Sequence, residues 1–311
     1  MPPSPWTRRR RRVLGVLALA LLGLGAAWLP LRYYHLDNRL QRWSHHWHAD
    51  ARWNQPHWRA HSLWLPGYAY DVEGRIVAGI EDNLSGLSYD ASRQHLLATI
   101  NRPSEVLILD LEGQILQRHR LHGSSDVEAI AWLGDTRIAL LQEGRRSVII
   151  TDLPERDGVP IELAQARTLQ LPLAKAGNDG PEGLAYDRAS DTLYISKERT
   201  PMGLYALHGI SGTAAPVLTD LSGWLRALPF ATDLSSVEFD PVHRHLLLLS
   251  DESQLLAELT LDGRPVSWAT LPTGRWRLPA PQPEGVAVDT AGTIYLVSEP
   301  NLFYRMRRRT P

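Results

Sequence analysis

Side chains that bear oxygen recur at two positions of a repeated pattern in the 311-residue chain. One set opens short apolar segments and consists of Ser85, Glu128, Glu182, Ser235 and Glu284. The second set closes the apolar segments that follow and consists of Asn101, Glu143, Glu198, Glu252 and Glu299. Partners in the two sets are 15 to 17 residues apart in every copy. Carboxylate and amide oxygens are the ligands that hard cations such as Ca²⁺ prefer, so the spacing raises the question of a metal site.

The segments that carry the first set share one pattern of alternating apolar residues that usually ends in Asp. They are LSGLSYD (84–90), VEAIAWL (127–133), PEGLAYD (181–187), LSSVEFD (234–240) and PEGVAVD (283–289). A second apolar segment follows each copy, and third and fourth segments follow with Gly-containing turns typical of hairpins. Four short antiparallel strands in each of several repeats are typical of a β-propeller. We therefore predict an all-β fold with five blades.

The two ends of the repeat region are expected to pair and close the ring of blades. The last copy has only three predicted strands, and we expect YAYDVEGRIVAGI (68–80) to supply the missing outer strand. Pairing of this kind closes the ring and leaves no long exposed sheet edge. A sixth blade within residues 203–230 remains an alternative.

First and second strands of a blade are antiparallel neighbours, so both oxygen-bearing sets are expected at one mouth of the central channel. Like charges there repel: two carboxylates about 6 Å apart at an effective dielectric near 20 cost roughly 3 kcal/mol. A cation, retained protons or a basic side chain must offset this repulsion. The nearby basic side chains are Arg102, Arg145, Lys197 and Arg199.

Three interpretations of the acidic mouth remain open. In the first, Glu128, Glu182 and Glu284 hold a metal ion, most simply Ca²⁺. The side chains expected to bind a ligand are then Ser85, Asn101, Glu143, Glu198, Glu252 and Glu299. In the second, the acids accept hydrogen bonds from the backbone of neighbouring blades and have only a structural role. In the third, the mouth is a ligand or catalytic site without metal. Zinc is not expected, because no histidine occupies any of these positions.

Composition and the motifs that the sequence lacks exclude several function classes. The chain has 33 basic and 34 acidic side chains, whereas nucleic-acid-binding proteins carry a basic excess. It has no cysteine, which excludes disulfides and a thiol nucleophile. The sequence also lacks a G-x-S-x-G elbow, an H-E-x-x-H motif and a Gly-rich phosphate loop, so we expect no organic cofactor.

The N-terminus has the features of a signal anchor. Residues 1–12 contain five consecutive arginines, and residues 13–31 are uncharged and apolar. As a helix these 19 residues would extend roughly 28 Å, which is close to the hydrocarbon thickness of a bilayer. The arginines favour a cytoplasmic N-terminus with the remaining chain in the periplasm. A cleaved signal peptide is the alternative, because small residues stand at 25–27.

Residues 32–66 differ in composition from the predicted propeller at 67–311. They contain five tryptophans and six histidines, among them the run HHWH at 45–48. Tryptophan is enriched at the level of lipid headgroups, so we interpret the segment as interfacial and juxtamembrane. A zinc site in HHWH is the alternative, although adjacent histidines point in different directions on a helix.

Two segments resemble a known protein family. PEGVAVDTAGTIYLVSEPNLFYRM (283–306) is similar to the C-terminal signature of the SdiA-regulated family, the YjiK-like proteins of Gram-negative bacteria. NLSGLSYDASRQHLLATINRPSEVLILDLEGQIL (83–116) resembles the first blade of that family, and the similarity extends over about residues 77–305. The resemblance implies a β-propeller behind one N-terminal membrane anchor and implies little about chemistry. The long segment at 32–66 differs from the short spacer expected in this family.

These features together predict a propeller anchored in the inner membrane that faces the periplasm. Its acidic mouth would bind a divalent cation, and the protein would act as a binding module for a ligand or another envelope protein. The alternative is a metal-dependent hydrolase of the lactonase or phosphoesterase type. In that case Glu128, Glu182 or Glu284 would hold the metal, and Glu198 or Glu299 would act as general base.

Overall fold

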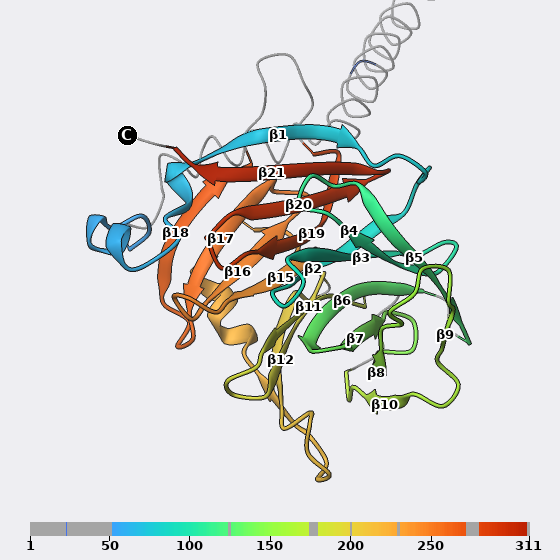
Figure 1. Ribbon diagram of the computed structural model, residues 1–311. Helices are drawn as coiled ribbons and strands as arrows, with labels where there is room; N and C mark the ends of the chain where they lie inside the picture. The colour runs from blue at the N-terminus through green and yellow to red at the C-terminus, as the bar shows by residue number, and fades with distance from the viewer. Residues whose placement is uncertain are drawn as a thin grey trace, which may run out of the picture. The chain divides into compact units, whose positions relative to one another are not determined.

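The computed structural model describes Gly23 and residues 52–123, 126–173, 180–199, 201–228, 231–271 and 280–309. The chain divides into two compact units, Met1–Ala49 and Asp50–Pro311, and every strand of the described residues belongs to the second. These strands form five antiparallel sheets around a common axis (Figure 1). The innermost strand of each sheet contacts the innermost strand of the next, and the last contacts the first. The unit is thus a five-bladed β-propeller, as the repeats predicted.

The blades follow one another along the chain, and each extends from an inner strand to an outer one. The first consists of β2 (Leu84–Asp90), β3 (His95–Ile100), β4 (Glu105–Leu109) and β5 (Ile115–His122), with β9 (Ile161–Glu162) parallel to β5. The second consists of β6 (Val127–Gly134), β7 (Arg137–Gln142), β8 (Ser147–Asp152) and β10 (Arg167–Gln170). The third consists of β11 (Pro181–Asp187), β12 (Thr192–Lys197), β13 (Gly203–His208) and β14 (Val217–Asp220). The fourth consists of β15 (Ser236–Asp240), β16 (His245–Ser250), β17 (Leu255–Thr260) and β18 (Pro265–Thr270). The fifth consists of β19 (Gln282–Val288), β20 (Ile294–Glu299), β21 (Leu302–Arg308) and β1 (Tyr68–Ile76).

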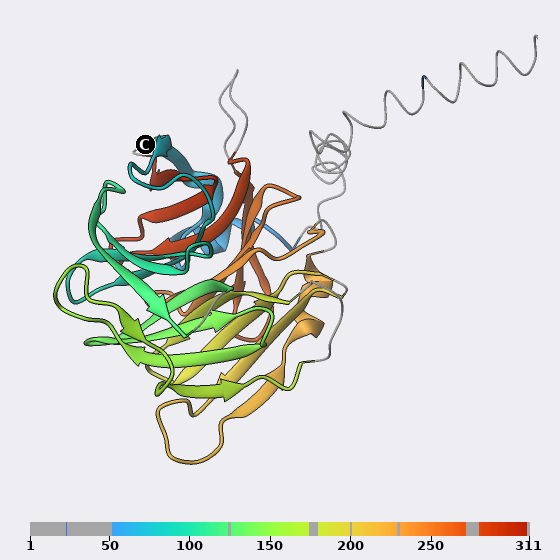
Figure 2. The same cartoon turned by 90° about the vertical axis from the view of Figure 1, so that its right-hand side faces the viewer.

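The first strand of the propeller closes the ring. β1 pairs antiparallel with β21, with Tyr68 opposite Arg308 and Ile76 opposite Leu302. The cyan β1 and the red β21 lie side by side although they come from opposite ends of the described chain (Figures 1 and 2). This pairing confirms the prediction for residues 68–80. The alternative of a sixth blade is wrong, because β13 and β14 within residues 203–230 complete the third blade.

The small residue that follows each mouth position is required by packing between blades. A Cβ on Gly86 would lie 2.6 Å from the Cα of Ala129 on the next inner strand. A Cβ on Gly183 would lie 2.6 Å from the backbone nitrogen of Val237. These separations are shorter than carbon contacts allow, since optimal spacing is about 3.5–4.0 Å. The repeat keeps small residues at this position because neighbouring inner strands approach to backbone contact.

The aspartate that ends most copies of the pattern stabilises the turn after the inner strand. The Oδ1 atom of Asp187 accepts a hydrogen bond from the backbone nitrogen of Ala189 at 3.0 Å. Asp90, Asp240 and Asp289 accept the same i to i+2 bond at 2.9 Å. Asp side chains commonly bond to the backbone two residues on in this way. The recurrence of Asp therefore has a structural explanation.

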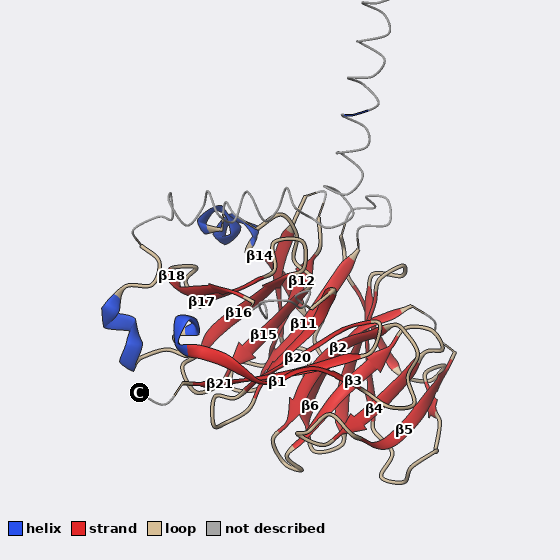
Figure 3. Cartoon of the chain, turned by 90° about the horizontal axis from the view of Figure 1, so that it is seen from above, coloured by secondary structure: helices blue, strands red, loops and turns tan. Residues whose placement is uncertain are grey.

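Residues before β1 pack on the fourth blade. Trp53 is buried in a cluster with Leu255 and Trp268, and the backbone nitrogen of Asn54 donates to the carbonyl of Val266 at 3.0 Å. Two short 3₁₀ helices follow, η1 (Pro56–Ala60) and η2 (Leu65–Gly67), and a third, η3 (Ser222–Ala227), precedes the fourth blade. Figure 3 shows the helices at the periphery of the strands. The described part of the segment predicted to be interfacial thus contains core residues of the propeller unit.

The predicted anchor and most of the Trp/His-rich segment lie outside the described residues. These are residues 1–31, with the exception of Gly23, and residues 32–51, including the HHWH run. Within the described residues no helix is long and apolar enough to cross a membrane. Anchor, cleavage site and zinc alternative stay predictions.

Candidate metal and ligand site

The starts of the inner strands are joined by hydrogen bonds between blades. The hydroxyl of Ser85 donates to the backbone oxygen of Glu128 at 2.7 Å. The hydroxyl of Ser235 donates to the backbone oxygen of Pro283, also at 2.7 Å. The two serines therefore have a structural role at this mouth, and the glutamates occupy the equivalent position in the other three blades.

Three carboxylates of the second blade form a group that could hold a metal ion. One oxygen from each of Asp126, Glu128 and Glu143 lies within 4.8 Å of the other two, and the three side chains are half-buried. Asp126 and Glu128 come from the start of β6, and Glu143 follows the end of β7. Ca²⁺ binds oxygens at 2.3–2.6 Å, so two oxygens bound to one ion lie no farther apart than twice that distance. The three carboxylate oxygens meet this condition. Among the described residues this is the one group of three His, Asp or Glu side chains with such spacing.

Glu128 is the centre of the group, and its carboxyl group loses its proton near neutral pH. Burial raises its pKa to about 7, and repulsion from Asp126, Glu143 and Glu299 adds to the shift. The amide nitrogen of Asn101 donates a short hydrogen bond to its Oε1 atom. The Oδ1 atom of Asn101 is itself buried, with no hydrogen-bond partner among the described residues. Asn101 thus adds one unused oxygen beside the three carboxylates.

Glu182 and Glu284 lie close to Glu128 but outside its group of three. Burial raises the pKa of each well above its usual range, and repulsion between the two and from Glu128 adds to the shift. Neither carboxylate has a hydrogen bond or an ion pair within the described part of the chain. Burial also raises the pKa of Glu299, and Asp82 raises it further. Among the described residues, no side chain or backbone group pairs with these three carboxylates.

The other predicted ligand-binding acids do have partners. The guanidinium of Arg199 contacts Glu252 at 2.7 Å and also bonds to Glu198. The Oε1 atom of Glu143 accepts a hydrogen bond from the backbone nitrogen of Gly180 at 2.9 Å. Lys197, another predicted counter-charge, instead donates to backbone oxygens of Arg199 and Pro201. The mouth is therefore divided into a side where arginine offsets the acids and a side where no described cation does so.

Asp126, Asp233 and Asp251 belong to this mouth although the repeats did not single them out. Asp233 accepts hydrogen bonds from the backbone nitrogens of Asp251 and Glu252 at 3.0 and 3.1 Å. Burial raises the pKa of Asp233 to about 6 and that of Asp251 to about 8. Strand alternation could not have identified Asp126, because it precedes β6 with a positive φ of 70° and the register shifts between Val127 and Ala129.

The fold and the site together define the class of protein to which this chain belongs. Five sheets around one axis, with a charged mouth formed by the starts of the inner strands, make this chain a five-bladed propeller with a polar channel entrance. Its sequence matches the model of the SdiA-regulated family over residues 60–307, so the chain belongs to that family. This confirms the resemblance that the segments 83–116 and 283–306 carry.

Two solved structures are similar to this chain at low sequence identity. Glutaminyl cyclase from Myxococcus xanthus is 19% identical with a TM-score of 0.53, and the match covers 76% of this chain and 98% of that one. Regucalcin from Agrobacterium tumefaciens, a calcium-binding protein, is 12% identical with a TM-score of 0.48, covering 75% of this chain and 92% of that one. Similarity at this level concerns the fold.

Proposed function

We propose that this protein binds a divalent cation, Ca²⁺ in the simplest case, at the mouth formed by Asp126, Glu128 and Glu143. The observation that carries the proposal is the group of three carboxylate oxygens within 4.8 Å of one another. Asn101 would add a neutral oxygen, and Glu182 would add a further charge from the adjacent blade. Ca²⁺ takes six to eight oxygen ligands, so water or a bound ligand would complete its coordination.

The electrostatics favour a bound cation over a purely structural role. Asp126 and Glu143 accept backbone hydrogen bonds from Gly144 and Gly180, each at 2.9 Å, which hold these two carboxylates in place. The neighbouring Glu182 and Glu284 have neither a hydrogen bond nor an ion pair among the described residues. A divalent ion would stabilise the ionised forms of these acids by direct attraction. In the metal-free protein these acids retain protons, which a divalent ion would displace.

Addition of Ca²⁺ to the purified full chain tests this proposal. We expect Ca²⁺ to raise the melting temperature, because a ligand that binds only the folded state stabilises it. Glu128→Gln, which keeps the shape of the side chain, should abolish the response. Asp262→Asn, which changes an exposed hairpin acid by the same charge, should retain it. An unchanged melting temperature in wild type, together with no metal in elemental analysis, would contradict the proposal.

We propose further that the protein acts as a binding module of the cell envelope, anchored by residues 13–31 with the propeller in the periplasm. The five arginines before this apolar segment favour that orientation. Fusion of a reporter enzyme to the C-terminus, active only in the periplasm, checks the orientation. A cytoplasmic signal would contradict it.

A metal-dependent hydrolase is a second candidate function, and the raised pKa of Glu299 favours it. A general base works best with a pKa near the working pH; burial shifts the pKa of Glu299 in that direction, whereas a bound metal would shift it back. Glu198 suits the role less well, because Arg199 already bonds to its carboxylate. In this function Glu299→Gln abolishes lactone or phosphoester hydrolysis without loss of Ca²⁺ binding, whereas a binding module has no turnover to lose.

A further inference from the structure

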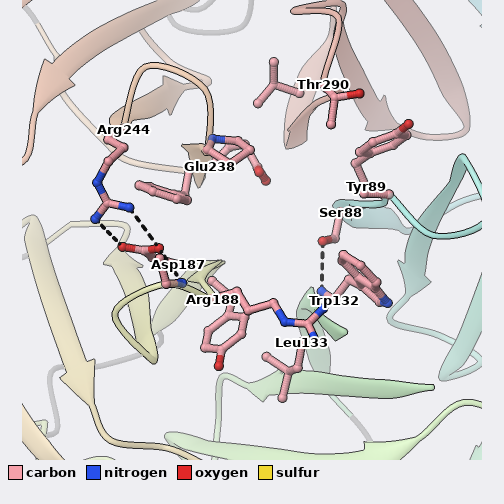
Figure 4. A pocket seen from close by; sticks show the side chains of 15 residues that line it. Ser88, Tyr89, Trp132, Leu133, Asp187, Arg188, Glu238, Arg244 and Thr290 are labelled. Atoms are coloured by element: carbon pink, nitrogen blue, oxygen red, sulfur yellow. Dashed lines mark hydrogen bonds and ion pairs between the residues drawn. The ribbon is translucent and has the colours of Figure 1, made fainter. Parts of the chain in front are cut away.

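A second cavity lies at the opposite end of the inner strands from the acidic mouth. It has a volume of about 480 Å³, which is within the range of small-molecule sites. Residues from all five inner strands line it, so it lies on the propeller axis. The labelled side chains in Figure 4 surround it from several blades. Neither the cation site nor the candidate hydrolase makes any use of this cavity.

Aromatic rings form much of the cavity wall. They belong to Tyr89, Trp132, Tyr186 and Phe239, which occupy the same position in four copies of the repeat. The polar atoms of two rings are already engaged: the Trp132 indole nitrogen donates to the carbonyl of Asp135 at 3.1 Å, and the Tyr186 hydroxyl donates to Asp191 at 2.8 Å. These rings therefore offer the cavity π surface rather than hydrogen bonds.

Two buried carboxyl groups, Asp187 and Glu238, line the cavity, and only Asp187 has a basic partner. Glu238 on β15 lines the cavity, and only 9% of the residue is exposed. The equivalent positions in three other copies are alanines, Ala131, Ala185 and Ala287. Glu238 has no side-chain partner within the described chain, and only the backbone nitrogen of Phe239 favours its ionised form. Burial raises its pKa well above the usual range of a glutamate. A buried acid without a partner is costly, so its presence at this one copy requires an explanation.

Two arginines line the same cavity, and they differ in how their charge is balanced. Arg244 pairs with Asp187 at 2.8 Å, and its guanidinium carbon lies 5.5 Å from the centroid of the Phe239 ring. Arg188 is exposed, and its guanidinium lies against Gly134, where an added Cβ would approach its Nη1 atom to 2.7 Å. Charge on an exposed arginine is screened by water, whereas the charge of a buried glutamate is not. Both arginines are exposed, so Glu238 is the buried side chain of the cavity whose negative charge, once it ionises, no described basic side chain balances.

From these observations we propose that the cavity binds a small organic cation, an amine or a quaternary ammonium compound. The ammonium group would pair with the Glu238 carboxylate, and the ring of Trp132 would contact the ammonium group through a cation–π interaction. Aromatic rings around a carboxylate are suited to such ligands, because the rings replace hydration of the cation without competing hydrogen bonds. The ligand enters as a cation and Glu238 releases its proton to solvent, so the site gains no net charge.

Choline is the probe that tests this proposal, because its charge does not change with pH. Neohexanol, the alcohol in which carbon replaces the nitrogen of choline, is the matched uncharged compound. We expect calorimetry on the full chain to show choline binding at least about tenfold more tightly than neohexanol, within the energy range of cation–π and charge pairing. Choline affinity should increase as the pH is raised, with one proton released for each choline bound.

Two cavity variants test whether choline binds in this cavity rather than through the overall charge of the protein. Glu238→Gln keeps the side-chain shape and should remove the preference for choline over neohexanol, while Asp262→Asn should retain it. Trp132→Leu keeps an apolar wall without a π face and should also reduce choline affinity, which provides a second test if Glu238→Gln fails to fold. Equal affinity for the two compounds, undetectable choline binding, or full choline binding by both cavity variants would each overturn the proposal.

Discussion

The glutamates at the acidic mouth differ in whether a neighbouring group offsets their charge. Glu198 and Glu252 share Arg199, and Glu143 accepts a backbone hydrogen bond, whereas Glu182, Glu284 and Glu299 have no such partner among the described residues. Sequence position does not separate these two groups, since all six are glutamates at repeated positions. The difference determines how the protein responds to pH.

Stability of the metal-free protein is expected to fall as the pH rises from about 4.5 to about 8. The folded-state pKa is about 6 for Asp233, about 7 for Glu128 and about 8 for Asp251, each above its ordinary value of 3.8 or 4.5. The folded protein thus binds protons in this range that the unfolded chain has released. The contribution of these three groups to stability is greatest below their unfolded pKa and is lost as the pH passes through the folded values.

Urea denaturation at several pH values, with chelator and with Ca²⁺, measures this dependence. Ca²⁺ should reduce the loss at high pH, because it stabilises the ionised acids. Stability that rises from pH 5 to 8 in the presence of chelator would contradict the pKa shifts.

Elements of the propeller are constrained most strongly where inner strands touch. The positions of Gly86 and Gly183 leave no room for a side chain, because the backbone of the next blade is in contact. Serines at the same mouth link blades through backbone oxygens. Contacts of this kind fix the spacing of the blades and hence the diameter of the channel.

Gly183→Ala should destabilise the protein by about 1–3 kcal/mol, because the new Cβ would meet the backbone of β15 and overpack the contact between blades. Gly212→Ala is the control, since its Cβ would have no atom nearer than 3.6 Å. The control should change stability by no more than about 0.5 kcal/mol. Denaturant unfolding of both variants compares them, and equal stability would argue against the close approach.

At the scale of the whole molecule, the chain before β1 is part of the propeller unit. Glu258 is fully buried and accepts hydrogen bonds from the backbone nitrogens of Leu63 and Trp64 at 3.0 and 3.3 Å. It also contacts His245 at 2.9 Å and Ser267 at 2.7 Å. One buried carboxylate thus connects the segment that follows the predicted anchor to the fourth blade.

Glu258→Ala should cost about 3–5 kcal/mol, the range observed when one partner of a buried charged network is removed. Loss of the carboxylate removes the acceptor of the Leu63 amide and leaves the Trp64 amide only Ser62 Oγ at 3.1 Å, so this segment should open before the rest of the unit. Hydrogen exchange should therefore increase at residues 62–65 more than in β20. An equal increase in hydrogen exchange at residues 62–65 and in β20 would indicate that Glu258 does not stabilise this segment in particular.

The sequence by itself determined the repeat, the number of blades, the closing strand and the position of the acids at one mouth. These follow from local rules: alternation places side chains on a face, and antiparallel pairing brings strand starts and ends together. Only the tertiary structure decided which acids meet, because side-chain contacts depend on rotamers and on the packing of the strands. Examples are the group of Asp126, Glu128 and Glu143 and the ion pair of Arg199 with Glu252. The burial of Trp53 and the cavity around Glu238 also required the closed ring, since five distant segments form that cavity and none of them shows it alone.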